Sequence, residues 1–494
     1  MSKKIFSFPA VFASVLIILQ FFTFSAAQDV DIRVKITVAD QIRAEISGRF
    51  LDAAKAVKPR EMWFLDDYAG IGGLAKRRSD VLIYDRWNYL IARRALSSTT
   101  RVRSDIVGGY RFTVDLTPLP SASAGAHVSW ASGDVGLIML DDIFPQTNAK
   151  TAKVTLELPT GWQVLGIDPQ TGPNMFTFSN TEKAVFYIGR GIRNRQIRRS
   201  GPPLDLAMSG EWLFTDEEAV AMTTSIYTAY ERLFGGLPDR AARVSLLKFP
   251  VASRPGAWEA ETRGSTVTIL SSDMPFKAQS IQRLHEQLRH EMFHLWIPNA
   301  VNLSGSYDWF YEGFAIYASL KHGVAANQIR FDDMLASLAQ AYNIETLQPD
   351  KRSLVQASRD RWLGGNSRVY ARGMLVAFLC DVRMMERSKG KRVIEDVIRD
   401  IYRGNPLTGE RRDGNDTIVA ALRSHAELVP LVERYITGAE PFDWSSELAL
   451  AGIEQTGVSP GIKLNVTSKP TGRQKDLLDR LGYNNWRKLA GTLK

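Results

Sequence analysis

The 494-residue sequence predicts an α+β protein with several domains, and three patterns along the chain support this prediction. Residues 29–200 contain short segments in which polar and apolar residues alternate, which is typical of strands with one buried face. Two short segments, 244–249 and 265–270, are interpreted as strands of a small sheet. From residue 277 onward, apolar residues recur at helical spacing instead.

The first 27 residues have the layout of a secretory signal peptide. Two lysines precede an apolar run from Ile5 to Phe24, and the small residues Ser25-Ala26-Ala27 follow it. We therefore expect residues 1–27 to be a signal peptide and the mature protein to be exported, either periplasmic or secreted. Because the apolar run is about as long as a bilayer is thick, the alternative is an uncleaved leader, and only then do we expect a membrane partner.

Residues 28–203 are predicted to form an N-terminal β-sandwich-like domain. Residues 31–38 and 153–158 alternate polar with apolar side chains, and the turn residues Pro159-Thr160-Gly161 follow the second segment. Strands of this length, separated by Gly, Pro and Asn, are typical of an antiparallel β-sandwich. The glycine-rich residues 70–73 are interpreted as a turn, because no Gly-Lys-Ser/Thr follows to make a phosphate loop.

A second domain is predicted over residues 204–325, followed by a helical lobe over residues 326–440. The first helix of the second domain, 216–234, begins with three acidic residues, which favour a helix N-terminus. Later helices are predicted at 277–297, 308–322, 331–345, 367–387, 392–402 and 415–437. Residues 441–494 show no sustained pattern, so we expect an irregular C-terminal tail.

The composition, with 45% hydrophobic and 23% charged residues, is ordinary for a soluble globular protein. No nucleic-acid-binding module is recognisable, so we expect no nucleic-acid partner. The single cysteine, Cys380, lies in an apolar run, and we expect a buried thiol and no intrachain disulfide. The formal net charge is +9, and five arginines before Pro202 are interpreted as a solvated linker rather than a polyanion-binding patch: Arg190, Arg193, Arg195, Arg198 and Arg199.

The segment His290-Glu291-Met292-Phe293-His294 is the most specific pattern in the chain. Residues four apart lie on one face of a helix, so the two imidazoles can bind one metal ion, while Glu291 is rotated toward the position of a base. Glu312, on a second predicted helix, can supply the third ligand. Three protein ligands leave a position for water, which is the arrangement of a catalytic rather than a structural zinc. The sequence therefore predicts a Zn²⁺ hydrolase.

The expected chemistry follows from this ligand set. Zinc lowers the pKa of a bound water to about 7. Glu291 would accept the proton during attack on a carbonyl carbon and pass it to the leaving amine. The resulting oxyanion needs a further hydrogen-bond donor, which is worth on the order of 3 kcal/mol. Tyr370, at the start of a long predicted helix, is a candidate donor, but spacing alone does not select it from the other tyrosines.

These segments resemble the gluzincin metallopeptidases of clan MA, most closely the glycyl-aminopeptidase-like family and more distantly the aminopeptidase N family. The similarity lies in the metal-binding helix, in a Trp-x-x-Glu-Gly-Phe-x-x-Tyr segment and in a Tyr-x-Arg-Gly segment: residues 290–296, 309–317 and 370–373. It implies a thermolysin-like zinc peptidase domain over residues 204–325. Many relatives continue into a PDZ domain, but residues 441–494 are too few to form one, so we expect no PDZ domain there. The similarity also implies zinc on His290, His294 and Glu312, Glu291 as the base and Tyr370 as the oxyanion donor.

The resemblance also indicates where the substrate binds. Gly256-Ala257-Trp258-Glu259-Ala260 stands where these families carry Gly-Gly-Leu-Glu-His or Gly-x-Met-Glu-Asn, whose glutamate binds a free amino terminus. We therefore expect Gly256 and Ala257 to contact the substrate and Glu259 to pair with its α-ammonium group. Such a pair would select amino-terminal cleavage, because an internal amide carries no charge.

The expected function is that of an exported zinc-dependent aminopeptidase whose partner is a peptide with a free amino terminus. Ala260 replaces a residue that is usually polar in these families, which leaves a zinc endopeptidase of the same fold as one alternative. The other alternative is a non-catalytic binding protein of the cell envelope that retains the peptidase fold. Activity on substrates with a blocked amino terminus would distinguish the first alternative, and a protein without zinc or turnover would indicate the second.

Overall fold

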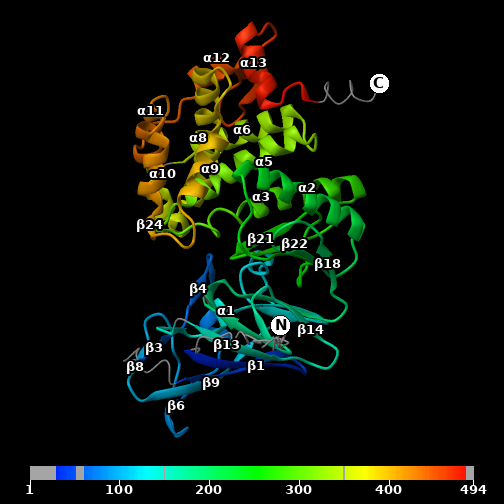
Figure 1. Ribbon diagram of the computed structural model, residues 1–494, viewed down its shortest axis with the longest axis vertical. Helices are drawn as coiled ribbons and strands as arrows, with labels where there is room; N and C mark the ends of the chain where they lie inside the picture. The colour runs from blue at the N-terminus through cyan, green and yellow to red at the C-terminus, as the bar shows by residue number, and fades with distance from the viewer. Residues whose placement is uncertain (1–28, 52–59, 150, 180, 349–350, 486–494) are drawn as a thin grey trace, which may run out of the picture.

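The computed structural model describes residues 29–51, 60–149, 151–179, 181–348 and 351–485, and the expected signal peptide lies outside these ranges. The chain forms stacked layers, with β-sheets at its N-terminal end and helices at its C-terminal end (Figure 1). Among the described residues, no helix is both long enough and apolar enough to cross a bilayer.

Two sheets packed face to face form the core of the N-terminal region. The larger sheet contains, in spatial order, β15 (Gln170–Gly172), β16 (Met175–Phe178), β13 (Ala152–Glu157), β1 (Val30–Val38), β2 (Ile42–Phe50), β9 (Val107–Asp115), β6 (Val81–Asp85) and β7 (Leu90–Arg94). The smaller sheet contains β10 (Trp130–Ser132), β11 (Val135–Met139), β17 (Val185–Gly189) and β14 (Gln163–Leu165). Peripheral elements are β3 (Arg60–Trp63), β4 (Asp67–Tyr68), β5 (Ile71–Gly72), β8 (Val102–Ser104), β12 (Gln146–Thr147) and the short helix α1 (Leu140–Ile143).

The alternation of polar and apolar residues in β1 places one face of this strand in the core. Val34 and its even-numbered neighbours are buried, while Arg33 and Lys35 face outward. The expected antiparallel arrangement is only partly correct, because β1 pairs in parallel with β13 and the large sheet is therefore mixed. The long connection between these two strands passes through the smaller sheet, which allows the chain to return in the same direction.

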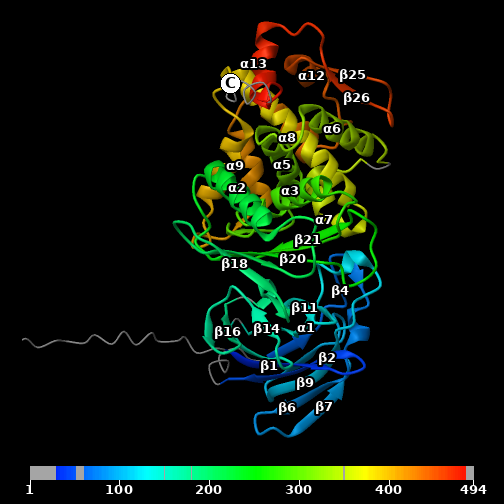
Figure 2. The same cartoon turned by 90° about the vertical axis from the view of Figure 1, so that its right-hand side faces the viewer.

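A third sheet begins the second domain and carries the strand nearest to the candidate site. Its order is β18 (Arg193–Ile197), β19 (Leu204–Met208), β20 (Ala242–Leu247), β22 (Thr266–Ser271) and β21 (Trp258–Arg263). β20 and β22 are buried on both faces, as expected of central parallel strands. β21 is an edge strand that pairs antiparallel with β22. Figure 2 shows this sheet between the β-sandwich and the helices.

The arginine-rich segment is not a solvated linker but includes the edge strand β18, which lies before the predicted boundary at residue 203. Arg193 and Arg195 point to Asp216 at the start of the next helix, at 3.0 and 3.3 Å. Arg199 pairs with Glu231 at 2.7 Å on the same helix. Arg193 and Arg195 of this strand are thus met by the acidic start of that helix, whereas Arg199, which follows the strand, pairs with a glutamate near the C-terminal end of the helix.

The helices largely follow the predicted ranges. They are α2 (Asp216–Phe234), α3 (Lys277–Phe293), α4 (Asp308–Tyr311), α5 (Gly313–Ala325), α6 (Phe331–Thr346), α7 (Leu354–Arg359), α8 (Asn366–Ser388), α9 (Ile394–Gly404), α10 (Gly414–Arg423) and α11 (Val429–Leu431). The single helix predicted at 415–437 is instead broken into α10, α11 and the π-helical turn η6 (Val432–Thr437). Pro430 explains the break, because proline lacks the N–H that a continuous helix requires. A two-stranded pair, β23 (Leu303–Ser304) and β24 (Arg412–Asp413), joins the loop before α4 to the lobe.

The described part of the C-terminal segment, up to residue 485, is not irregular, which corrects the prediction for residues 441–494. It contains α12 (Ser445–Ala451), β25 (Ile453–Thr456), β26 (Lys463–Val466) and α13 (Gly472–Leu481). Leu448, Leu464 and Leu477 join the hydrophobic core of the helical lobe. These elements are too short, and too often interrupted by glycine and proline, to give a sustained periodic pattern.

Candidate zinc centre and active site

Helix α3 presents the two histidines of the metal motif at its C-terminal end. The apolar residues Leu288 and Met292 of this helix are buried in the core and fix its orientation. His290 lies in the last turn, and His294 follows the final helical residue while its backbone N–H still donates to the carbonyl of Glu291. The two Nε2 atoms are 3.4 Å apart, so the helical spacing brings both imidazoles to one point.

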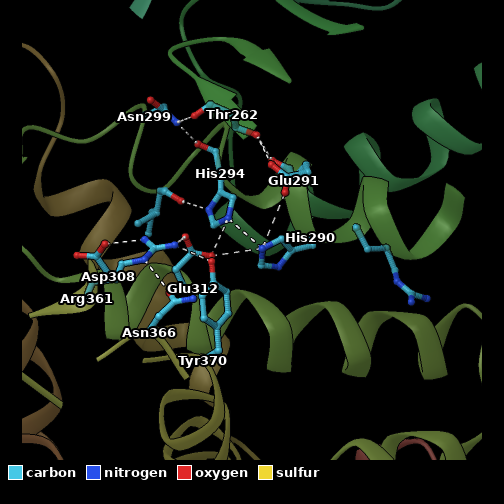
Figure 3. A network of polar contacts seen from close by, with 12 residues as sticks. Thr262, His290, Glu291, His294, Asn299, Asp308, Glu312, Arg361, Asn366 and Tyr370 are labelled. Carbon is cyan, nitrogen blue, oxygen red and sulfur yellow. Dashed lines mark hydrogen bonds and ion pairs between the residues drawn. The ribbon is translucent and has the colours of Figure 1, made fainter. Parts of the chain in front are cut away.

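Glu312 completes this group from the junction between α4 and α5. Its Oε2 atom lies 3.4 Å from His290 Nε2 and 3.6 Å from His294 Nε2 (Figure 3). Among the described residues, His290, His294 and Glu312 form the group that could hold a metal ion, and Glu312 Oε2 is buried there without a hydrogen-bond partner. The three side chains that the sequence predicts as metal ligands therefore converge.

The spacing of the three ligand atoms fits a zinc ion. Donors that lie 2.0–2.1 Å from a tetrahedral zinc are about 3.4 Å from one another, and the three observed separations are 3.4, 3.4 and 3.6 Å. His294 Nδ1 lies 3.2 Å from the carbonyl of Ile297, which fixes the tautomer that leaves Nε2 free to bind a metal. The residues present thus fit Zn²⁺ in both geometry and donor type.

The electrostatics of Glu312 also favour cation binding. Burial alone would raise the pKa of this carboxyl group, but the imidazoles of His290 and His294 and the guanidinium of Arg361 outweigh it and hold the pKa well below its usual value. The carboxylate therefore stays ionised although its side chain is only 10% exposed. An ionised, buried carboxylate beside two imidazoles is a suitable ligand set for a divalent metal.

Glu291 lies beside this point and is held from the edge strand. The hydroxyl of Thr262 in β21 is 2.8 Å from Glu291 Oε2, and Glu291 Oε1 is 4.0 Å from His290 Nε2. The side-chain amide of Asn299 donates to the backbone carbonyls of Thr262 and His294, at 3.0 and 3.1 Å, and so ties the end of α3 to β21. Glu291, the predicted base, is thus fixed next to the metal ligands but is not part of the ligand group.

Tyr370, the predicted oxyanion donor, reaches the site from α8. It can do so because two glycines allow the backbones of α5 and α8 to touch. A Cβ on Gly313 would lie 2.4 Å from Gly373 Cα, and a Cβ on Gly373 would lie 2.6 Å from the carbonyl oxygen of Trp309. This close approach brings the N-terminal part of α8, with Tyr370, against the segment that carries Glu312.

Arg361 joins Tyr370 to the ligand Glu312 and was not predicted from the sequence. Its Nη2 atom donates to the Tyr370 hydroxyl at 2.7 Å and lies 3.1 Å from Glu312 Oε1, while Nη1 pairs with Asp308 at 2.6 Å (Figure 3). Its Nε donates to Asn366 at 3.1 Å. One guanidinium therefore holds both the candidate oxyanion donor and the third metal ligand.

These residues line a cavity of about 520 Å³ between the sheet, the helical lobe and the N-terminal domain. The N-terminal domain contributes several polar residues to the lining: Tyr68, His127, Asp141, Glu182 and Lys183. Glu261 of β21 links the two domains, because its carboxylate accepts hydrogen bonds from Tyr68 at 2.6 Å and from His127 at 2.9 Å and pairs with Arg263 at 3.0 Å. No short sequence pattern could have revealed this link, since Tyr68 and Glu261 are 193 positions apart.

The residues predicted to bind the substrate lie next to this cavity but do not line it. From β21 the lining begins at Ala260, whereas Gly256, Ala257 and Glu259 lie before it. Glu259 is partly buried, and although burial raises the pKa of its carboxyl group, the nearby His127 opposes this shift. Glu259 and Glu261 are two residues apart in a strand and so share one face.

No protein-family model and no curated protein matches this sequence. Solved structures do match. An aminopeptidase N family protein from Idiomarina loihiensis is similar with a TM-score of 0.66 at 14% identity, over 90% of this chain and 82% of that chain. An M1 zinc metallopeptidase from Deinococcus radiodurans, crystallised as a point mutant bound to a Tyr-Ser-Ala substrate, gives a TM-score of 0.52 at 14% identity, over 84% of this chain and 95% of that chain. A two-domain M1 zinc metallopeptidase mutant bound to L-arginine gives 0.51 at the same identity. The chain therefore has the mixed α and β fold of the gluzincin-type zinc peptidases.

Proposed function

We propose that this protein is a zinc-dependent aminopeptidase that hydrolyses amino-terminal residues from peptides. The observation that carries the proposal is the convergence of His290, His294 and Glu312 at zinc spacing, with Glu291 and Tyr370 in the same cavity. The fold shared with M1 zinc metallopeptidases agrees with it. Within that fold, the motifs of the metal helix favour the glycyl-aminopeptidase-like family.

A zinc ion held by the three ligands would lower the pKa of a water molecule and polarise the substrate carbonyl. Glu291, oriented by Thr262, accepts a proton from the attacking water and then donates it to the leaving amine. The Tyr370 hydroxyl donates to the oxyanion that forms on the substrate carbonyl. Arg361 holds that hydroxyl in place, with its charge beside the developing negative charge.

Carboxylates in the cavity lining support recognition of a free amino terminus. Asp141, Glu182 and Glu261 outnumber the cationic Lys183 and Arg263 on the side formed by the N-terminal domain and β21, away from the helical lobe. A substrate ammonium group would be attracted to this side, whereas the neutral amide of an internal peptide bond would not. We keep Glu259 as the proposed amine ligand, with Gly256 and Ala257 as proposed backbone contacts, and note that Glu261 lies closer to the cavity on the same strand face.

We also infer that the protein is exported to the periplasm or secreted. The support is the sequence of residues 1–27, in which two lysines, an apolar run and small residues follow one another. The expected partner in that compartment is a peptide. The M1 zinc metallopeptidase neighbours, one from Deinococcus radiodurans crystallised with a tripeptide and one crystallised with an amino acid, are consistent with a peptide substrate.

The proposal is tested by metal analysis together with turnover of aminoacyl reporter substrates. We expect about one zinc per chain, loss of activity with a chelator and recovery on adding zinc. Glu291→Gln should retain zinc and lose about 10²- to 10⁴-fold in kcat, because the base is removed but the ligands stay. A protein without zinc, whose activity is unchanged by Glu291→Gln, would contradict the proposal and favour the non-catalytic binding protein.

Peptides with a free or an acetylated amino terminus separate the aminopeptidase from the endopeptidase. An aminopeptidase loses activity on the acetylated peptide, and an endopeptidase keeps it. Glu259→Gln should weaken use of free-amine substrates strongly, because the bound ammonium loses its charge partner. An unchanged rate for Glu259→Gln, with a reduced rate for Glu261→Gln, would transfer the amine-binding role to Glu261.

A further inference from the structure

A second group of buried polar side chains lies on the metal-binding helix and has no role in the proposed chemistry. Arg289 and His285 belong to α3, and His322 belongs to α5. Arg289 is 2% exposed and His285 is 4% exposed, and the rings of His285 and His322 are stacked with centroids 6.5 Å apart. The guanidinium of Arg289 packs against Gly323, where a Cβ would overlap its Nη1 atom.

Four polar atoms of this group have no hydrogen-bond partner in the described part of the chain. They are Nε and Nη1 of Arg289, Nδ1 of His285 and Nε2 of His322. Buried arginine side chains in proteins are normally paired, because an isolated buried charge carries a large free-energy cost. A group with a full positive charge and unused donors therefore lacks its natural counterpart, an anion.

The neighbouring protein groups do not supply this anion. Glu286 follows His285 on α3 but pairs with Arg283 at 2.8 Å, and its side chain is 51% exposed. The hydroxyl of Tyr230 donates to the backbone carbonyl of Arg289 and leaves the guanidinium unsatisfied. No ion pair of Arg289 with a carboxylate is present among the residues that the structure describes.

We propose that the guanidinium of Arg289, between α3 and α5, binds a small inorganic anion of the size of chloride. Nε–H and Nη1–H of the guanidinium supply two donors, and a ring N–H of His285 or His322 can supply another. Burial lowers the pKa of His285 to about 3 and that of His322 to about 4, with the charge of Arg289 acting in the same direction. Both imidazoles are therefore neutral near pH 7, and one monovalent anion balances the charge of Arg289.

The surroundings favour a small ion and offer it an approach. The guanidinium packs closely against Gly323, which favours a small ion over an extended organic ligand. A cavity of about 820 Å³ lies nearby, lined by Ile281, one helical turn before His285, and by Val324, which follows Gly323. An anion bound at Arg289 would join two helices, one carrying His290 and the other beginning after Glu312. This inference does not depend on peptidase activity.

The test is thermal unfolding of the full-length protein in sodium chloride or bromide against sodium gluconate at equal ionic strength. We expect Tm to rise with halide concentration and to saturate, because a ligand that binds only the folded state stabilises it by mass action. Gluconate is too large to enter the site and should give no saturable rise. Arg289→Gln should lose the halide-dependent rise, whereas Arg283→Gln, on the same helix at the surface, should keep it.

Since Arg289→Gln can fail to fold, bromide-soaked crystals of the unaltered protein provide an independent result. An anomalous bromide peak within hydrogen-bond distance of Arg289 Nε and Nη1 supports the proposal. Ordered water alone at that position, equal Tm values in chloride and gluconate, or a halide-dependent rise that persists in Arg289→Gln would each overturn it.

Discussion

Replacing Arg361 with glutamine should lower turnover far more than it weakens substrate binding. The guanidinium is 12% exposed and touches Tyr370, Glu312 and Asp308 at 2.7, 3.1 and 2.6 Å. Without it, the Tyr370 hydroxyl loses the donor that holds it beside the metal ligands. Two buried carboxylates also lose their shared positive charge. None of these contacts is expected to involve the substrate in the ground state, so the effect should appear in kcat.

The magnitude can be bounded from these contacts. Removing one oxyanion donor costs about 10²- to 10³-fold in kcat, and that loss is the limit expected for Tyr370→Phe. Arg361→Gln keeps the Tyr370 hydroxyl but removes the hydrogen bond that orients it. We therefore expect a loss of about 10- to 10²-fold in kcat, with KM changed less than about threefold. Breaking the buried ion pairs should also cost about 3 kcal/mol of stability.

The assay is steady-state kinetics on a free-amine reporter peptide, at matched zinc content, for the single variants and for Arg361→Gln combined with Tyr370→Phe. If Arg361 acts through Tyr370, the combined variant should be no slower than Tyr370→Phe alone. Arg361→Lys should bind zinc normally but turn over more slowly than the unaltered protein. Lysine keeps the positive charge, but it lacks the planar guanidinium that contacts Tyr370 and Glu312 together. Additive losses, or a change confined to KM, would refute this reasoning.

The remaining predictions address packing and pH. Gly373→Ala should destabilise the fold by about 1–3 kcal/mol and lower kcat, because its methyl group would collide with the backbone near Gly313; Gly404→Ala, at an open position, is the thermal-unfolding control. Burial raises the pKa of Glu261, but Arg263 and His127 outweigh it and lower the pKa to about 2 from 4.5. The stability that ionised Glu261 contributes is therefore present above about pH 4.5 and lost as the pH falls toward 2. The Tm difference between wild type and Glu261→Gln should shrink across that window, and a constant difference would contradict the assignment.

Features that depend on local spacing could be predicted from the sequence. The helix α2 occupies the predicted range 216–234, and its Thr215–Glu218 capping box satisfies the first turn. His290 and His294 converge because every α-helix places residues four apart on one face. Each of these inferences depends only on residues within a single helix, so it does not require knowledge of the tertiary structure.

Contacts between distant segments could not be predicted in this way. Arg361 meets Asp308 across 53 positions, and Glu261 meets His127 across 134. The parallel pairing of β1 with β13 likewise depends on how the long intervening segment folds. In each case many other residues of the same type have a similar local sequence, and only the packing of helices and strands determines which of them make contact.

The glycines at the helix crossing explain why Tyr370, which only the family resemblance indicates in the sequence, lies at the site. Tyr370 alone carries no spacing signal, but Gly373 follows it by one helical turn, and Gly313 directly follows Glu312. Their contact makes the close approach of α5 and α8 possible, and that approach sets Tyr370 against the metal ligand. The Glu-Gly and Tyr-x-x-Gly segments are therefore packing signals as much as chemical ones. A tyrosine at the same place in a helix without this glycine would be held too far from the site to reach an oxyanion.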